Sequence, residues 1–405
     1  MGRLSAMRSA WFVPMASGTQ ARSGGTGAPV AGALAVGLAA GWNIANTGAA
    51  AGTLSSAYGV SLPTIGLLTT ALFLTHFGSQ VPGGILIDRF GPRPVGFAAL
   101  SVIAVGNAIA LAFASFPLAV VARLIIGLGT GTGFVAGSDW VRAARRSSVG
   151  QGLYGGFSVA GGGLAVLMVP LLEPALGWRS AYVAALGVSL VPLVGLTRSA
   201  ELAAHFPNAY PFRRVVHERP LYLLAALHTA SFGLSVIASN WVVSLLTRRG
   251  VSHGVAGLVG SLLLLGGLAT RPLAGVVVRR RPHLERPLLS FSMIGGGAGI
   301  AVLATPAPIP VLTFAACLAG LAAGVPFASV FTGAQRIQPA SPAAAIGLVN
   351  AVATFTILAG TPLVGLSFLL PGDGRIGFAV LAALWCSAAC AVPAGYRALI
   401  SGSDL

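Results

Sequence analysis

The chain has 405 residues, of which 55% are hydrophobic and only 8% charged, and its mean hydropathy is +0.87. Soluble domains carry about 25% charged residues, so this composition excludes a soluble globular protein and predicts one that crosses a membrane many times. The net charge of +16 reflects 24 basic residues, all of them arginine. Because these arginines are scattered in short stretches between apolar runs, they predict no nucleic-acid-binding face.

An N-terminal stretch, residues 1–28, is followed by twelve apolar runs. The stretch holds only a short apolar segment and no clear cleavage pattern, so we expect a disordered cytoplasmic tail and no signal peptide. Each later run has about the 20 residues that a helix needs to cross a bilayer. The predicted spans are 30–52, 63–87, 95–113, 117–138, 150–172, 180–197, 220–247, 254–278, 288–304, 311–333, 342–369 and 375–395.

The longest polar interval, Arg198 to Arg219, divides the twelve runs into two sets of six. The predicted fold class is therefore an all-α membrane protein with twelve transmembrane helices in two six-helix bundles. The predicted parts are an N-terminal bundle at 29–198, a cytoplasmic linker at 199–219, a C-terminal bundle at 220–397 and a second cytoplasmic tail at 398–405.

The distribution of the arginines predicts the orientation of the chain. With both termini in the cytoplasm, 18 arginines fall on the cytoplasmic side, four on the opposite side and two inside the membrane. Short cytoplasmic loops carry an excess of arginine and lysine, so we expect a multi-pass protein of the cytoplasmic membrane with both termini inside. The four on the opposite side are Arg179, Arg248, Arg249 and Arg375.

A short charged turn separates the second and third runs, in the stretch Gly84-Ile-Leu-Ile-Asp88-Arg89-Phe-Gly91-Pro-Arg93. Its glycines allow helices to approach closely on either side of the turn. A charged turn packed against neighbouring spans can hold one conformation and release another. The stretch resembles the signature loop of the major facilitator superfamily of secondary transporters, with five identities at fixed spacing in the same topological place.

The resemblance implies a fold, a mode of action and a gate. Two bundles would rock about a site for a small-molecule solute near the middle of the lipid bilayer, with no cofactor, no metal, no enzyme activity and a monomeric state. In that family the loop acid contacts span eleven when the cytoplasmic side is shut, and an acid ending span four pairs with a loop arginine. The implied gating residues are Gly84, Asp88, Arg89, Gly91, Arg93 and Asp139.

Polar side chains within the spans must find partners, since lipid offers none. The predicted substrate path is outlined by His76, Gln80, Asn43, Asn46, His228, Asn240 and Asn350. Any one of these can instead form a hydrogen bond between helices.

Arg123 begins Arg-Leu-Ile-Ile-Gly127, which resembles the fourth-span motif of the same family. An embedded arginine costs about 2.5–3.5 kcal/mol on insertion scales, so we expect a role for it. One interpretation is substrate binding, and the alternative is a structural hydrogen bond between helices.

Arg271 precedes Pro272 in span eight and is the strongest candidate for a substrate contact. An arginine before proline at this place resembles transporters of small anions such as nitrate, oxalate and monocarboxylates, in which it contacts the anion. A guanidinium binds a carboxylate through two parallel hydrogen bonds. The two halves repeat weakly, and the position related to Arg271 is Gln80, where nitrate carriers place a second arginine; this argues against nitrate. The alternative is an arginine that reaches the cytoplasmic edge.

The sequence therefore predicts a transporter, a symporter by preference, that moves a small organic or inorganic anion by alternating access. The alternative is a multidrug or metabolite efflux transporter working as a proton antiporter, although no acid lies at the centre of a span. Protons are a candidate coupling partner, carried by His76 or His228 or by a weak-acid substrate, and the remaining alternative is uncoupled transport. A membrane enzyme or sensor is disfavoured because no triad, carboxylate pair or metal cluster stands out.

Overall fold

The computed structural model describes residues 28–145, 147–196 and 212–401. Within these ranges the regular secondary structure is helical and contains no strand. The predicted tail at 1–28 lies almost wholly outside the described residues, as does the predicted domain boundary at 198–199. That boundary stays a prediction.

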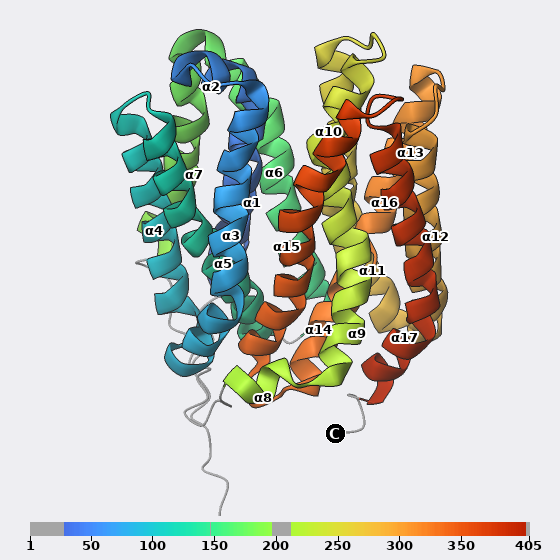
Figure 1. The fold of residues 1–405 in the computed structure, drawn as a ribbon. Coiled ribbons are helices and arrows are strands. Elements are labelled where there is room, and N and C mark those ends of the chain that lie inside the picture. Colours follow the sequence, from blue (N-terminus) through green and yellow to red (C-terminus); the bar gives the residue numbers. More distant parts are fainter. Residues whose placement is uncertain (1–27, 146, 197–211, 402–405) are drawn as a thin grey trace, which may run out of the picture.

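Helices of the N-terminal half cross the molecule from end to end (Figure 1). They are α1 (Ala28–Ala49), α3 (Leu62–Phe90), α4 (Pro92–Ala112), α5 (Phe116–Arg145), α6 (Ser148–Leu176) and α7 (Ser180–Leu196), while the short α2 (Ala51–Tyr58) follows α1 in the chain. The structure places the α2 helix at one end of the bundle, which we call the α2 end.

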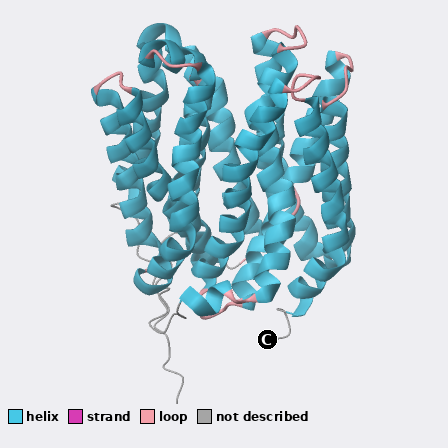
Figure 2. Ribbon diagram, in the orientation of Figure 1, coloured by secondary structure: helices cyan, strands magenta, loops and turns pink. Residues whose placement is uncertain are grey.

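The C-terminal half begins with the short helix α8 (Phe212–Val216), which lies at the opposite end, here called the α8 end (Figure 1). Its other helices are α9 (Arg219–His228), η2 (Thr229–Gly233), α10 (Leu234–Thr247), α11 (His253–Arg280), α12 (Glu285–Leu303), α13 (Ile309–Gly324), α14 (Phe327–Ile337), α15 (Pro342–Leu366), α16 (Arg375–Ser387) and α17 (Val392–Ser401). Helices fill the space between the two ends, and most loops lie at the ends (Figure 2). An exception is the two-residue break between α13 and α14, at Val325 and Pro326, which interrupts a crossing.

Ten helical stretches of the described residues are long and apolar enough to cross a membrane. Helices α1 and α3, with 22 and 29 residues, are of comparable length and run alongside them (Figure 1). Several crossings consist of two consecutive helices, such as α9 with α10 and α13 with α14. The predicted all-α fold of twelve membrane-crossing helices in two bundles is confirmed.

Helix ends depart from the predicted spans in several places. The first span was expected to reach residue 52, but α1 ends at Ala49 and α2 follows as a separate helix. At the α8 end, α5 continues to Arg145 and α17 to Ser401, so the expected tail from residue 398 begins inside a helix. An apolar run marks the thickness of the hydrocarbon layer, whereas helical hydrogen bonding continues into the polar region beyond it.

Two pairs of helices hold the halves together. Helix α3 packs on α15, and α6 packs on α11, with α14 also touching α6. At the α8 end the Ser148 hydroxyl donates a hydrogen bond to the Gly275 carbonyl, 3.0 Å away, which joins α6 to α11. These contacts leave the space between the bundles lined by residues from both halves.

Candidate functional site

A cavity lies between the two halves, on the α2 side of these contacts. Its walls come from α1, α3, α5 and α6 of one half and from η2, α10, α11 and α15 of the other. It holds about 640 Å³ of empty space, part of it open to solvent. The lining residues are Gly41, Ile44, Ala45, Phe73, His76, Phe134, Ser158, Val159, Gly162, Phe232, Val236, Ser239, Asn240, Leu264, Arg271 and Asn350.

Arg271 is the one charged residue among the described residues that line this cavity. Its side chain is only 2% exposed, and its Nη1 donates a hydrogen bond to the Gly155 carbonyl of α6, 2.8 Å away. Nε has no hydrogen-bond partner, and no carboxylate of the described residues forms an ion pair with the guanidinium. The structure thus places Arg271 in the wall of the cavity between the halves.

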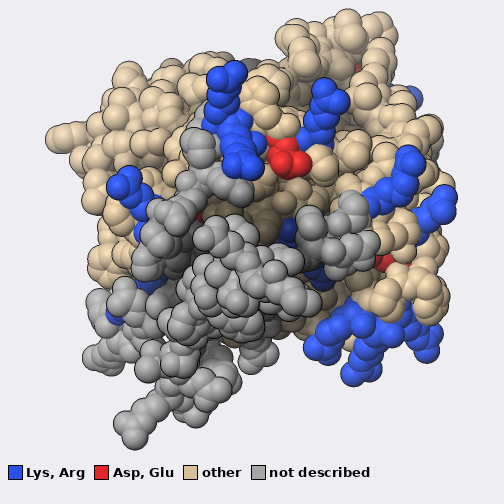
Figure 3. Space-filling view, turned by 90° about the horizontal axis from the view of Figure 1, so that it is seen from below, with Lys and Arg blue, Asp and Glu red and all other residues tan. Residues whose placement is uncertain are grey.

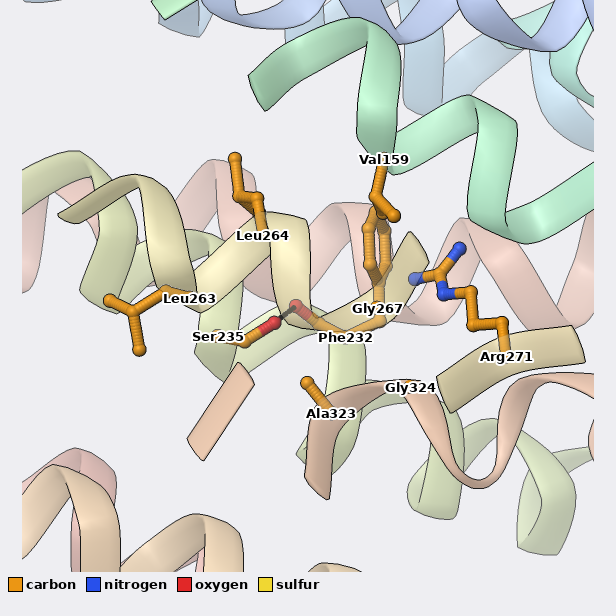
Figure 4. A pocket seen from close by; sticks show the side chains of 9 residues that line it. All are labelled: Val159, Phe232, Ser235, Leu263, Leu264, Gly267, Arg271, Ala323 and Gly324. Atoms are coloured by element: carbon orange, nitrogen blue, oxygen red, sulfur yellow. Dashed lines mark hydrogen bonds between the residues drawn. The ribbon is translucent and has the colours of Figure 1, made fainter. Parts of the chain in front are cut away.

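Aromatic rings cover the faces of this guanidinium. The centre of the Arg271 guanidinium lies 4.2 Å from the ring centroid of Phe327 and 5.4 Å from that of Phe232. Figure 4 shows the guanidinium beside the Phe232 ring, with Val159 of α6 next to them. Cation–π contacts of this kind stabilise a desolvated arginine by about 2 kcal/mol or more.

A local change of helix type places Phe232 in the cavity wall. Residues Thr229–Gly233 form a π-helical turn between α9 and α10, a feature that is frequent at functional sites. The sequence predicts His228 of this span as a site residue but not Phe232, which lies one turn further on. Phe134 and Phe327 were missed as well, because an apolar ring within an apolar span carries no sequence signal that separates cavity from lipid.

Two histidines of the predicted path are buried and hydrogen-bonded. His76 lines the cavity, and its Nδ1 lies 2.9 Å from the Thr130 hydroxyl. His228 Nε2 lies 3.1 Å from the Asn350 side-chain oxygen, and its ring stacks on Phe232 at 5.1 Å. Asn350 therefore touches the cavity and fixes His228 at the same time.

Asn240 and Gln80 occupy contrasting positions. Asn240 lines the cavity and is exposed. Gln80 is fully buried where α3 crosses α15, and neither polar atom of its side-chain amide has a partner within the described residues. It is not among the lining residues.

Arg123, Asn43 and Asn46 lie away from the cavity lining, inside the N-terminal bundle. Arg123 donates to the Leu68 carbonyl of α3 at 3.2 Å, and to the Asn43 carbonyl and the Asn46 side chain of α1 at 2.7 and 3.1 Å. The Asn43 side chain accepts a hydrogen bond from Asn107 of α4. Three predicted substrate contacts thus belong to a network that joins helices, because each finds its acceptors inside one bundle.

Asp88 joins the two halves at the α8 end. Its two carboxylate oxygens accept hydrogen bonds from the backbone N–H groups of Ala343 and Ala344, each at 3.0 Å, at the start of α15. Asp88 is 1% exposed. A carboxylate at a helix N-terminus gains from two charge-assisted hydrogen bonds and from the helix dipole, so this contact holds α3 against α15.

The glycines of the same turn allow the close contact. A Cβ atom at Gly84 would lie 2.6 Å from the Ala343 carbonyl oxygen, so any larger residue would push the two helices apart. Gly91 ends α3 with φ +90°, a conformation that side chains disfavour.

The other predicted gating residues lie around this contact. Asp139 is buried near the end of α5 and accepts two hydrogen bonds from Arg142, one of them 3.1 Å long. Arg89 is exposed, with its guanidinium 5.5 Å from the Phe90 ring, and Arg93 lies in the first turn of α4. The expected pairing of Asp139 with a loop arginine stays a prediction.

Two helical bundles meet at one end, and a cavity lies between them on the other side of that contact. Residues 32–361 match the sequence profile of the Major Facilitator Superfamily. The chain belongs to this family and is a multi-pass membrane protein.

Curated relatives match at low identity. A probable sulfoacetate transporter of Cupriavidus necator is 30% identical over 36% of this chain and 34% of its own length. The 4-hydroxybenzoate transporter of Pseudomonas putida is 24% identical over 74% of each chain. A 3-(3-hydroxy-phenyl)propionate transporter of Escherichia coli is 25% identical over 84% of this chain and 87% of its own length. The chain spans about a third of the first of these relatives.

Solved structures share the fold. The human organic anion transporter MFSD10 superposes with a TM-score of 0.70 at 16% identity, over 90% of this chain and 99% of the other. The proton:xylose symporter XylE superposes with a TM-score of 0.71 at 14% identity, over 90% of this chain and 94% of its own. At such identities the similarity establishes the fold alone.

Proposed function

We propose that this protein carries small organic anions across a cytoplasmic membrane by alternating access, and that Arg271 binds the anion. The observation that carries the proposal is the position of Arg271, a buried guanidinium that lines the cavity between the halves without a carboxylate partner. Removing a charge from water without a partner is costly. An anion that enters the cavity supplies the missing partner.

The chemistry of the cavity wall favours an anion over a cation. No aspartate or glutamate is among its described lining residues, so nothing there neutralises a lipophilic cation. His76, Asn240 and Asn350 are the proposed polar contacts besides Arg271. Several relatives are also named as transporters of anions or of compounds that are anionic at neutral pH, including sulfoacetate, nitrate and 4-hydroxybenzoate.

Alternating access requires a closure that can open. The proposed gate is the contact between α3 and α15, formed by Gly84 and Asp88 with Arg89, Gly91, Arg93 and Asp139 around it. With the arginine-rich α8 end in the cytoplasm, the described conformation is closed to the inside and presents the cavity to the outside. Proton coupling would run through the buried histidines or through a protonated substrate.

Thermal unfolding of the purified protein with a panel of anions tests the proposal. A ligand at 100 times its Kd stabilises the folded state by about 2.7 kcal/mol. We expect organic carboxylates or sulfonates to raise the Tm, and Arg271→Ala to abolish the increase. Uptake into proteoliposomes, with and without a pH gradient, then separates proton-coupled from uncoupled transport.

Arg279→Ala is the matched control. Arg279 lies on the same helix as Arg271, two turns closer to the α8 end, and is exposed. The control loses the same charge but should keep the anion-dependent Tm increase. Stabilisation by lipophilic cations alone, or an increase that survives Arg271→Ala, would refute the anion site and support an exporter.

A further inference from the structure

Aromatic rings line the cavity on both sides. Phe73 and His76 come from α3, Phe134 comes from α5, and Phe232 faces them from the other half. The rings of Phe73 and His76 lie 5.7 Å apart, and Phe134 makes an edge contact with Phe327 at 6.4 Å. Aromatic pairs gain energy beyond the burial of their area when their centroids lie 4.5–7 Å apart. A ring that enters this cavity can therefore stack against the wall.

The guanidinium of Arg271 presents only one edge to a ligand. Phe232 and Phe327 contact its faces, and Nη1 is bonded to the Gly155 carbonyl. Nε has no partner. The remaining edge, formed by Nε and Nη2, matches the two oxygens of one carboxylate.

A second negative charge on the ligand would find no partner. The lining contains no other arginine among the described residues, and Gln80, the position related to Arg271 in the repeat, is neutral. A second carboxylate would lie against Phe73, Phe134 or Val236 without a cation, which is costly. The cavity therefore selects for a single negative charge.

The apolar wall of the cavity disfavours the smallest anions as its best ligands. The larger apolar side chains of the lining are Ile44, Phe73, Phe134, Val159, Phe232, Val236 and Leu264. An ion such as acetate would contact Arg271 but leave the aromatic wall unfilled. An apolar ring would displace water from that wall and gain the hydrophobic contribution.

We infer that the preferred substrate is a monocarboxylate that carries one aromatic ring, with its carboxylate on the free edge of Arg271 and its ring against Phe134, Phe73 and His76. The inference rests on the function proposed above and specifies the substrate class of the same site. Both halves of the protein contact such a ligand, which places it at the joint between the moving parts.

Four probe anions test the inference in thermal-shift and uptake measurements on the full-length protein. They are benzoate, cyclohexanecarboxylate, acetate and terephthalate. Compared with benzoate, cyclohexanecarboxylate has a ring that is not aromatic, acetate has no ring, and terephthalate has a second negative charge. We expect benzoate to bind about threefold to tenfold more tightly than cyclohexanecarboxylate. Acetate and terephthalate should bind more weakly than either, by at least about a further tenfold.

Two leucine variants locate the ring. Phe134→Leu should reduce the preference for benzoate over cyclohexanecarboxylate to near unity and leave acetate binding unchanged. Phe97→Leu is the control, since Phe97 is exposed on α4, away from the cavity. Comparison of the two separates a stacking role from a general loss of packing.

The outcomes distinguish the inference from the proposed function. If acetate or terephthalate matches benzoate and all three depend on Arg271, the ring subsite is refuted and the anion site survives. If the preference for benzoate persists in Phe134→Leu at full strength, the proposed position of the ring is wrong. If no anion response depends on Arg271, both proposals fail together.

Discussion

At the scale of single residues, the two embedded arginines differ in what satisfies them. Arg123 has three oxygen acceptors from two helices of its own bundle, whereas Arg271 has one carbonyl acceptor and two aromatic rings at the contact between the bundles. Both sit in apolar runs, and both are predicted from the sequence as substrate contacts. One nitrogen of each, Arg123 Nη2 and Arg271 Nε, has no hydrogen-bond partner in the structure. From the larger number of acceptors around Arg123 we propose a structural role for it and a ligand-binding role for Arg271.

Arg123→Leu should lower stability without removing the anion response. The substitution removes the donor to the buried Asn46 side-chain oxygen, at about 1–3 kcal/mol for an unpaired group, and the second donors to the Leu68 and Asn43 carbonyls, which keep their helical hydrogen bonds. We expect a lower Tm in detergent but the same Tm increase on addition of the anion. An unchanged Tm with a lost anion response would instead assign Arg123 to the substrate site.

At the scale of helices, the closure at the α8 end depends on a carboxylate of one half that caps a helix of the other. Asp88 provides this cap to α15, whose own N-cap residue, Ser341, makes no side-chain capping bond. The free energy of the cap is available only while α3 and α15 are in contact. Under the proposed function it stabilises the closed conformation selectively, and the proposal requires it to be lost and regained during a transport cycle.

Gly84→Val should prevent this closure. The added Cβ would lie 2.6 Å from the Ala343 carbonyl oxygen and would separate Asp88 from the N-terminus of α15. We expect uptake into proteoliposomes to fall to background while the anion-dependent Tm increase persists, since the cavity residues are unchanged.

Gly66→Val provides the comparison for that experiment. Gly66 lies on the same helix, and a Cβ there would meet no atom within 4 Å. Its uptake should stay close to that of the parent protein. Equal loss of uptake in both variants would mean that the added side chain harms α3 in general and not the closure.

At the scale of the whole molecule, the charge distribution sets the proposed orientation. Arginine side chains gather on the face at the α8 end (Figure 3), while the four arginines assigned to the opposite side include Arg248 and Arg249. At the α2 end these two arginines donate hydrogen bonds to nearby groups. Arg248 donates to Asp373 and the Phe368 carbonyl, and Arg249 donates to carbonyls at the end of α12. Cytoplasmic loops are the ones enriched in arginine.

Labelling of intact cells checks this orientation. In a background without the three natural cysteines, Ser56→Cys on α2 should react with a membrane-impermeant maleimide. His283→Cys, in the exposed turn between α11 and α12 at the α8 end, should react only after the cells are permeabilised. The reverse pattern would place the α8 end outside and invert the proposed transport geometry.

The sequence by itself determined the membrane class, the twelve crossings and the two halves. Each of these follows from local quantities, namely the length of the apolar runs and the spacing of the charges. The thickness of the bilayer sets the length of each run, and its lack of hydrogen-bonding partners requires each run to be a helix. The signature loop and the Arg271-Pro272 pair also stand in the chain as contiguous residues. Interruptions of the helices, such as the π-helical turn at Thr229–Gly233, did not follow from the sequence, since the packing of neighbouring helices decides where they occur.

Only the tertiary structure decided which polar and aromatic residues share the cavity. Within an apolar run, periodicity cannot say whether a face meets lipid, a neighbouring helix or a water-filled space, because all three accept the same side chains. In the structure, Arg123 contacts helices of its own bundle. Arg271, Phe134 and Phe232 come from three distant segments and line the same cavity. The physical reason is that helices far apart in the chain bury these side chains against one another. Hydropathy along the chain does not record which helices do so.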